Sequence, residues 1–251
     1  QVAGIMAGAA RRAIGRVRDL VIPPACLLCD RLVESQGGLC AACWRQCRFI
    51  ERPCCEVLGT PFAYDPGPGA LSARAIAEPP PFARHRSVML YDDGARRLVS
   101  SLKFADRNEL APWMARLMRT AAREMLGDCE AVVPVPLHRL RLHERRYNQS
   151  AELARHFAAL SGLSYLPLVL ERHRSTRRQV GLSATERARN VQGAFRVPQA
   201  MRPLVEGRRV LLVDDVYTTG ATVAACARAL RRAGAPAVDV VTFAMVADGD
   251  I

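Results

Sequence analysis

The stretch Val210–Thr222, with the sequence VLLVDDVYTTGAT, decides the fold class of this 251-residue chain. Its pattern predicts a hydrophobic strand over 208–213, two adjacent carboxylates at Asp214 and Asp215, a Thr/Gly turn, and a helix that begins at Thr222. Ligands of open α/β sheets bind at the carboxyl edge of the strands. The backbone N–H groups and hydroxyls of such a turn suit a phosphate, because the dipole of the following helix favours an anion.

The two carboxylates suit another part of the same ligand. A carboxylate does not bind a phosphate directly, but it binds sugar hydroxyls, either directly or around a Mg²⁺ ion, which prefers hard oxygen ligands. A phosphate beside a polyol describes a ribose 5-phosphate. Gly220 lets the backbone approach the phosphate without a Cβ in the way. Two adjacent acids after a buried strand have little use in packing, so we expect a binding site rather than a merely exposed acid pair.

Strand and helix patterns alternate through the last two thirds of the chain. This alternation indicates a parallel sheet covered by helices on both faces. Residues 171–193 are rich in Arg and weakly patterned, so we expect a long loop there that serves as a linker or as a lid. Strands are predicted over 88–91, 131–136, 208–213 and 238–246, and helices over 94–104, 108–126, 148–160, 184–191 and 222–233.

Two basic segments lie next to the predicted strands. The first, LHRLRLHERRY at 137–147, can neutralise a pyrophosphate leaving group, although a solvated basic turn is the alternative. The second, RHRSTRRQ at 172–179, can fold over a pyrophosphate as a lid that excludes water, and a mobile linker is nearly as plausible. The predicted pyrophosphate and lid residues are Arg139, Arg141, Arg145, Arg146, Arg172, Arg174, Thr176, Arg177 and Gln179.

Four cysteines form two CxxC pairs, Cys26 with Cys29 and Cys40 with Cys43. Each pair can present two thiolates on one side, and two pairs complete a tetrahedral zinc site. Since four Cys ligands leave no position for water, the predicted zinc is structural. The other cysteines nearby either replace a ligand or bind no metal, and buried thiols are the preferred interpretation; they are Cys47, Cys54 and Cys55.

The composition is basic, with a formal net charge of +12, and Lys103 is the only lysine. Excess Arg indicates either a genome bias or a surface that meets phosphates. No run of about 18 apolar residues occurs, and the opening segment does not resemble a signal peptide, so we expect no membrane span. Nine cysteines without an export signal favour a reducing compartment, and the expected location is the cytoplasm.

The thirteen residues from Val210 to Thr222 resemble the signature with which type I phosphoribosyltransferases bind 5-phosphoribosyl-1-pyrophosphate (PRPP). The resemblance implies that Asp214 and Asp215, the expected catalytic pair, bind the 2′- and 3′-hydroxyls of the ribose. It also implies that the Thr/Gly turn holds the 5′-phosphate. The implied PRPP-binding residues are Asp214, Asp215, Val216, Tyr217, Thr218, Thr219, Gly220, Ala221 and Thr222.

Three blocks in the same order resemble the ComF family of competence-related proteins over residues 20 to about 246. They are PVPLHRLRLHERRYNQ, LERHRSTRRQVGLSATERARNVQGAF and LLVDDVYTTGAT. The resemblance implies a zinc-ribbon module over 23–82 and a phosphoribosyltransferase-like α/β domain over 83–251. Ahead of them, the spacing of the apolar residues predicts an amphipathic helix over 1–22. Family members often carry a second four-Cys site, but PCCEVLGTP at 53–61 lacks it, so we expect that this site is lost.

Three functions remain open at this point. The first is a PRPP- and Mg²⁺-binding phosphoribosyltransferase that acts on a base or amine, in the setting of DNA uptake. The second is a non-catalytic competence factor that binds single-stranded DNA or a helicase partner. The third is a purine or pyrimidine salvage phosphoribosyltransferase, for which the sequence shows no recognisable nucleobase pocket. Whether the chain is an enzyme is not decided by these patterns.

Overall fold

The computed structural model describes residues 23–34, 37–102, 109–137, 148–174 and 184–247. The chain divides into two compact units, Gln1–Cys47 and Arg48–Ile251. The predicted helix over 1–22 lies outside the described residues, and the predicted domain boundary between residues 82 and 83 stays a prediction.

The smaller unit is built on tight turns rather than on long elements. The amide of Cys26 donates to the carbonyl oxygen of Arg31 at 2.7 Å, which closes the first CxxC turn. The second CxxC pair begins at Cys40, the N-cap of the short helix α2 (Ala41–Trp44). Each cysteine pair therefore lies in a turn that local backbone hydrogen bonds hold.

The larger unit contains a five-stranded parallel sheet in the order β1-β7-β6-β2-β3, as the alternating pattern predicts. The two central strands are buried along almost their whole length, as expected of a sheet covered on both faces. The strands are β1 (His85–Leu90), β2 (Ala131–Pro134), β3 (Ser164–Tyr165), β6 (Val210–Tyr217) and β7 (Val238–Met245).

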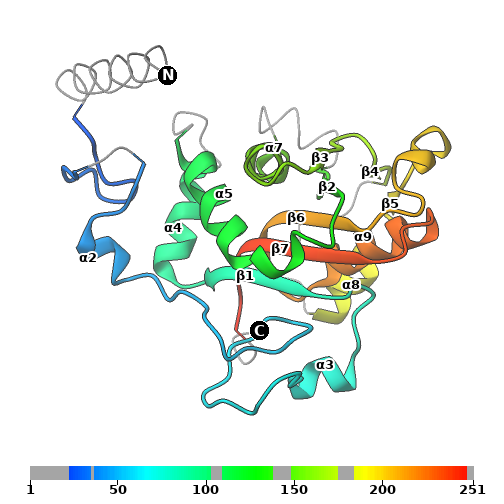
Figure 1. Ribbon diagram of the computed structural model, residues 1–251, viewed down its shortest axis with the longest axis horizontal. Helices are drawn as coiled ribbons and strands as arrows, with labels where there is room; N and C mark the ends of the chain where they lie inside the picture. The colour runs from blue at the N-terminus through cyan, green and yellow to red at the C-terminus, as the bar shows by residue number, and fades with distance from the viewer. Residues whose placement is uncertain (1–22, 35–36, 103–108, 138–147, 175–183, 248–251) are drawn as a thin grey trace, which may run out of the picture. The chain divides into compact units, whose positions relative to one another are not determined.

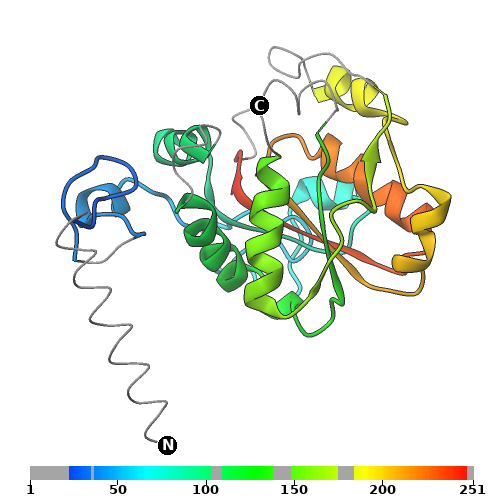
Figure 2. The ribbon, with the colours of Figure 1, turned by 90° about the horizontal axis from the view of Figure 1, so that it is seen from above.

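Helices cover both faces of this sheet (Figure 1). The helices α4 (Asp93–Leu102), α5 (Leu110–Ala121) and α7 (Gln149–Ser161) lie on one face, and Figure 2 shows α9 (Ala221–Arg232) and α3 (Ala73–Ala77) on the other. No helix among the described residues is long and apolar enough to cross a membrane. The remaining elements are β4 (Glu171–Arg172), paired with β5 (Phe195–Arg196), the helix α8 (Ala184–Val191), and the 3₁₀ segments η1 (Arg123–Met125) and η2 (Gln199–Leu204).

Helix α7 begins where its sequence predicts. The Asn148 side chain accepts a hydrogen bond from the amide of Ser150 at 3.1 Å and so caps the helix. The helix ends at Gly162, whose φ of 71° is the left-handed conformation that glycine adopts most readily. The cap matters for the site because it fixes the position of Ser150 in the first turn.

Two strands are longer than their sequences predict. Strand β6 does not end before the acids but continues to Tyr217, because its pairing with β7 extends through Asp214 opposite Thr242 to Tyr217 opposite Met245. Strand β1 begins at His85 instead of Val88, because its pairing with β7 starts with His85 opposite Val240, and the buried ring of His85 is hydrogen-bonded there. Polar residues can thus extend both strands, because the neighbouring strand β7 supplies hydrogen-bond partners for their backbone groups.

The segment that follows Cys47 packs with the sheet. The amide of Ile50 donates to Val88, and the amide of Leu90 donates to Arg48, at 2.9 and 2.8 Å. A network of ion pairs adds to this attachment: the buried Arg86 pairs with both Glu56 and Glu124, and Arg52 pairs with the same two acids.

Candidate phosphate-binding site and zinc cluster

The segment Thr218–Thr222, which we call the phosphate loop, joins β6 to α9. Gly220 has a φ of 79°, in the left-handed region, and so sets the conformation of this loop. A Cβ atom built there would lie 2.3 Å from the hydroxyl oxygen of Tyr217, so a side chain is excluded by the neighbouring ring as well as by the backbone angle. The loop conformation therefore requires glycine at position 220.

The phosphate loop ends in the first turn of α9. Gly220 is the N-cap residue, and its carbonyl oxygen accepts from the amide of Ala224 at 2.9 Å. The hydroxyl of Thr219 accepts from the amide of Ala221 at 3.4 Å. Because the first N–H groups of a helix have no carbonyl partner within the helix, and its dipole is positive at this end, the turn suits an anion.

Asp214 is an acid buried at the carboxyl half of β6. The hydroxyl of Ser150 donates to its Oδ1 atom at 2.7 Å, and the amide of Asp215 donates to the same atom at 3.0 Å. Burial, and then the charge of Asp215, raise the pKa of Asp214 to about 7, although the Ser150 hydrogen bond lowers it. Ionisation of Asp214 therefore weakens the fold, which is a cost expected of a binding residue rather than of a packing residue.

Asp215 makes different contacts from Asp214. It is half-buried, and its Oδ1 atom accepts from the amide of Val216 at 2.7 Å. Two adjacent carboxylates, one buried and one partly open, thus lie next to the phosphate loop. Their oxygens fit sugar hydroxyls, and they fit Mg²⁺, which takes oxygen ligands and would neutralise the charge of a bound polyphosphate.

The predicted lid residues take different places where the structure describes them. Arg172 is not in a loop but on β4, where it is buried with its guanidinium 5.4 Å from the ring centre of Phe195. Its positive charge lowers the pKa of Asp214, against the larger effect of burial. Arg174 is exposed and donates to the carbonyl of Gln192 at 2.8 Å. Outside the described residues lie Arg139, Arg141, Arg145, Arg146, Thr176, Arg177 and Gln179.

Sequence patterns did not indicate two residues next to the site. Ser150, whose hydroxyl donates to Asp214, reads in the sequence only as part of a helix start. Arg74, from α3, donates through Nη2 to the carbonyl oxygen of Thr219 at 2.7 Å, across 145 positions of sequence. Neither pairing has a local signal, because each depends on how distant elements pack.

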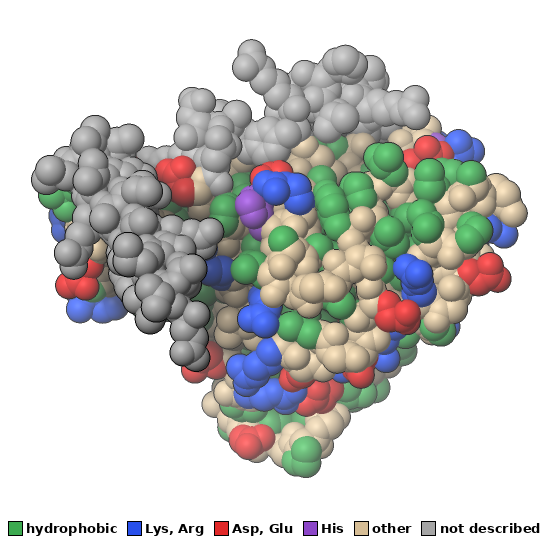
Figure 3. Space-filling view, turned by 45° about the horizontal axis from the view of Figure 1, so that its top comes forward, with side chains coloured by type: hydrophobic (Ala, Val, Ile, Leu, Met, Phe, Trp, Pro, Cys, Tyr) green, Lys and Arg blue, Asp and Glu red, His purple; other side chains and the backbone are tan. Residues whose placement is uncertain are grey.

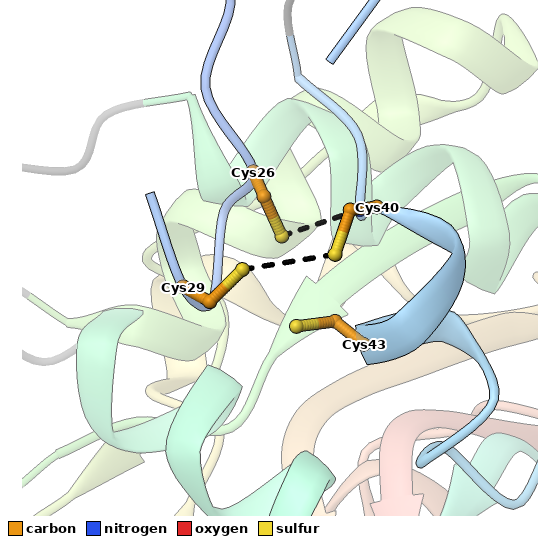
Figure 4. A group of neighbouring side chains, drawn as sticks. All are labelled: Cys26, Cys29, Cys40 and Cys43. Atoms are coloured by element: carbon orange, nitrogen blue, oxygen red, sulfur yellow. Dashed lines mark hydrogen bonds between the residues drawn. The ribbon is translucent and has the colours of Figure 1, made fainter. Parts of the chain in front are cut away.

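The four cysteines of the CxxC pairs converge in the smaller unit (Figure 4). Their sulfur atoms all lie within 4.8 Å of one another, and Cys29 and Cys40 are 3.6 Å apart. Sulfurs around a tetrahedral zinc ion at about 2.3 Å are separated by roughly 3.8 Å, so the cluster fits a structural zinc site. This confirms the predicted grouping of Cys26, Cys29, Cys40 and Cys43.

The environment of Cys26 suits a thiolate, whereas burial and the neighbouring cysteines raise the pKa of Cys43. Burial raises the pKa of Cys26, but hydrogen bonds from the amides of Cys40 and Leu28 outweigh it and lower the pKa to about 6. Amide donors to sulfur are common around zinc-bound thiolates because they stabilise negative charge.

The remaining cysteines are buried thiols. The structure places Cys47, Cys54 and Cys55 in the interior and joins none of them by a disulfide, which confirms their predicted burial. Cys129 and Cys226 are buried as well. Within the described part of the chain, the Cys26 cluster is the one group of metal-type ligands.

The parallel sheet with an acid pair and a glycine-capped loop at one strand end, together with the four-cysteine cluster, defines a phosphoribosyltransferase-like protein with an N-terminal zinc ribbon. Family models agree: a phosphoribosyl transferase domain matches residues 150–250, and a double zinc ribbon domain matches residues 17–75. The chain belongs to the ComF family.

Two relatives in sequence support this assignment. The chain is 36% identical over 229 residues to the DNA utilization protein YhgH of Salmonella typhimurium, a match that covers 88% of this chain and 96% of that protein. It is 28% identical to competence protein F of Haemophilus influenzae, with 86% and 94% covered. Among solved structures, the glutamine PRPP amidotransferase from B. subtilis matches 57% of this chain and 30% of its own, with 24% identity and a TM-score of 0.39.

Proposed function

We propose that this protein binds PRPP with Mg²⁺ at the phosphate loop and acts in the use of DNA taken up by the cell. The observation that carries the proposal is the buried Asp214 beside Asp215, next to a glycine-capped helix start. An acid whose pKa is raised to about 7 by burial is costly to keep ionised, and a ligand with hydroxyls or a cation repays that cost on binding.

Each part of the site has a role in this proposal. The phosphate loop holds the 5′-phosphate through the amides of the helix start. Asp214 and Asp215 bind the ribose hydroxyls, and Ser150 holds the Asp214 carboxylate in place. Mg²⁺ supplies positive charge for the pyrophosphate, and its fit rests on the oxygen donors of the acid pair. Arg172 adds a buried positive charge near Asp214.

The reaction that fits this arrangement is phosphoribosyl transfer. The bond between the anomeric carbon and pyrophosphate breaks, a bond to the nitrogen of a base or amine forms, and the nitrogen loses its proton to solvent. Positioning and charge stabilisation of pyrophosphate contribute most of the catalysis in such a reaction. The setting of DNA use comes from the names of the relatives, a DNA utilization protein and a competence protein.

Calorimetric titration tests the proposal directly. PRPP with Mg²⁺ is titrated into the zinc-loaded protein, and binding with a dissociation constant in the micromolar range is expected. The Asp214→Asn/Asp215→Asn double variant should bind at least about 100-fold more weakly, because two charged hydrogen-bond acceptors are lost. The matched control Asp93→Asn removes an acid that is 93% exposed and should bind as the wild type does. A folded wild type that releases no heat with PRPP refutes the proposal.

A second candidate is a non-catalytic factor that binds single-stranded DNA. The net charge of +12 and the names of the relatives favour it. On the face shown in Figure 3, however, basic side chains lie in small groups with acidic side chains beside them. Fluorescence anisotropy with labelled single-stranded DNA distinguishes the two functions: DNA affinity that falls steeply with salt and survives in the Asp214→Asn/Asp215→Asn variant supports this candidate.

A further inference from the structure

The segment from Pro53 to Glu78 overlaps the match to the double zinc ribbon, which ends at residue 75, but does not carry a second cluster of metal ligands among the described residues. Some of its side chains are instead part of the interior of the larger unit. Cys55, Leu58 and Ala75 belong to the same buried cluster as Tyr217, which precedes the phosphate loop. This part of the chain therefore packs beneath the candidate site.

A compact set of hydrogen bonds shapes this segment. The thiol of Cys55 accepts from the amides of Leu58 and Ser72 at 3.3 and 3.2 Å. The hydroxyl of Ser72 in turn accepts from the amide of Ala75 at 3.3 Å and caps α3. The turn at 55–58 and the helix α3 are thus held together around one sulfur atom, and α3 carries Arg74.

Arg74 links this segment to the phosphate loop. Its Nη2 atom donates to the carbonyl oxygen of Thr219 at 2.7 Å. The side chain is half-buried, which limits competition from water for this hydrogen bond. Since Thr219 lies one residue before Gly220, the bond restrains the loop next to the position where its backbone turns into the left-handed conformation.

A second link runs through His85 and Tyr217. The carbonyl of Leu58 accepts only, so the Nδ1 atom of His85, at 2.8 Å, carries the proton. The other ring nitrogen lies 2.9 Å from the hydroxyl of Thr242. The fixed imidazole stacks on Tyr217 with the ring centres 4.4 Å apart and the planes at 21°, and the Tyr217 hydroxyl lies where a Cβ of Gly220 would be. The ring of Tyr217 thus defines one wall of the loop.

We propose that the segment 53–78 serves as a buttress that positions the phosphate loop, with Arg74 as its positioning residue and with His85 of β1 connecting Leu58 to Tyr217. The inference rests on the proposed function for its consequence in ligand binding, but the restraint on the loop is independent of any ligand. Arg74 also places a positive charge next to the loop, which favours an anionic ligand electrostatically.

Hydrogen–deuterium exchange of the full-length, zinc-loaded protein tests the buttress without ligand. In Arg74→Met the amides of residues 218–222 should exchange about 5-fold faster or more, because local opening of the loop becomes easier. Arg74→Lys, which keeps a donor and a charge, should restore much of the protection. The matched control Arg119→Met changes an exposed arginine on α5 and should leave the loop unchanged.

Titration with PRPP and Mg²⁺ supplies the second readout. Arg74→Met should weaken binding about 10-fold, the usual effect of one hydrogen bond to a charged group, with a melting temperature close to that of the wild type. Loop exchange at the wild-type rate in Arg74→Met overturns the proposal, and so does unchanged PRPP affinity in that variant. If the wild type itself does not bind PRPP, the proposed function fails, and the exchange experiment still decides whether the buttress exists.

Discussion

At the scale of single residues, the site combines groups that are costly to bury. The carboxylate of Asp214 is held by two neutral donors, the hydroxyl of Ser150 and the amide of Asp215. The pKa of this carboxyl group is raised to about 7, mainly by burial and secondly by the charge of Asp215. A residue of this kind lowers the stability of the fold in exchange for a function.

This cost predicts the effect of Asp214→Asn. Because the folded-state pKa is raised, the stabilising contribution is present at low pH and is lost as the pH rises through about 7. The variant should therefore melt several degrees above the wild type at pH 8, since one pKa unit corresponds to about 1.4 kcal/mol. At pH 5 the difference should shrink. Calorimetry at both pH values, with Asp93→Asn as control, measures it, and a lower melting temperature at pH 8 contradicts the expectation.

The contribution of His85 to stability should depend on pH in the opposite sense to that of Asp214. Burial, together with the charge of Arg86, lowers the pKa of His85 to about 4, so the unfolded chain binds a proton between that value and 6.5 while the folded chain does not. Stability is then lost as the pH falls below 6.5, at about 1.4 kcal/mol per pH unit.

In His85→Phe this loss should disappear, so its melting temperature relative to the wild type should rise between pH 7.5 and pH 5 by the equivalent of about 2 kcal/mol. Thermal melting at both pH values measures the difference. The control His173→Phe changes an exposed histidine and should follow the wild type. A parallel pH dependence of wild type and His85→Phe would show that His85 is not held neutral.

At this scale, sequence patterns predict the site residues that are close together in the chain, but not the residues that contact one another only in the folded protein. The acid pair, Gly220 and the CxxC cysteines lie in local patterns whose residue types suffice to predict their grouping. Arg74 and Ser150 are 145 and 64 positions from their partners, Thr219 and Asp214. No local pattern encodes such pairs.

At the scale of elements, periodicity predicted where helices and strands lie, while their ends depended on neighbours. The predicted helix over 184–191 coincides with α8, and the cap at Asn148 is confirmed. Strand β6 extends past its predicted end because β7 supplies partners as far as Tyr217. The first turn of a helix is thus a local property, and the length of a strand is a property of the sheet.

The surroundings of the cysteines in the two CxxC turns and in segment 53–78 predict how many zinc ions each chain binds. Cys55 has the amide donors of a metal-binding thiolate, but the nearby Leu58 and Ala75 are apolar. We therefore expect about one zinc ion per chain, since a stable site needs four N, O or S ligands. Elemental analysis and native mass spectrometry measure the ratio. Cys40→Ser should lose the zinc and Cys55→Ser should keep it, whereas two zinc ions per wild-type chain would show a second site.

At the scale of the whole molecule, the two compact units differ in what stabilises them. The described part of the smaller unit buries few residues, among them Leu27, Leu28 and Cys43. Folded units of fewer than about 40 residues usually need a metal or disulfides, and the described residues of this unit are only 23–34 and 37–47. The larger unit has a five-stranded sheet with an extensive buried cluster of its own. Zinc should accordingly matter for the first unit and little for the second.

Loss of zinc should therefore separate the stability of the ribbon from the activity of the site. Cys40→Ser is preferred to chelation, because a chelator also removes the Mg²⁺ that PRPP requires. In this variant the main melting transition should shift by less than about 2 °C, and PRPP affinity should stay within about 2-fold of the wild type. Calorimetry and titration on the same samples measure both. A variant that keeps its main transition but no longer binds PRPP would mean that the ribbon takes part in forming the ligand site, and the two units would then have to be treated as one functional body.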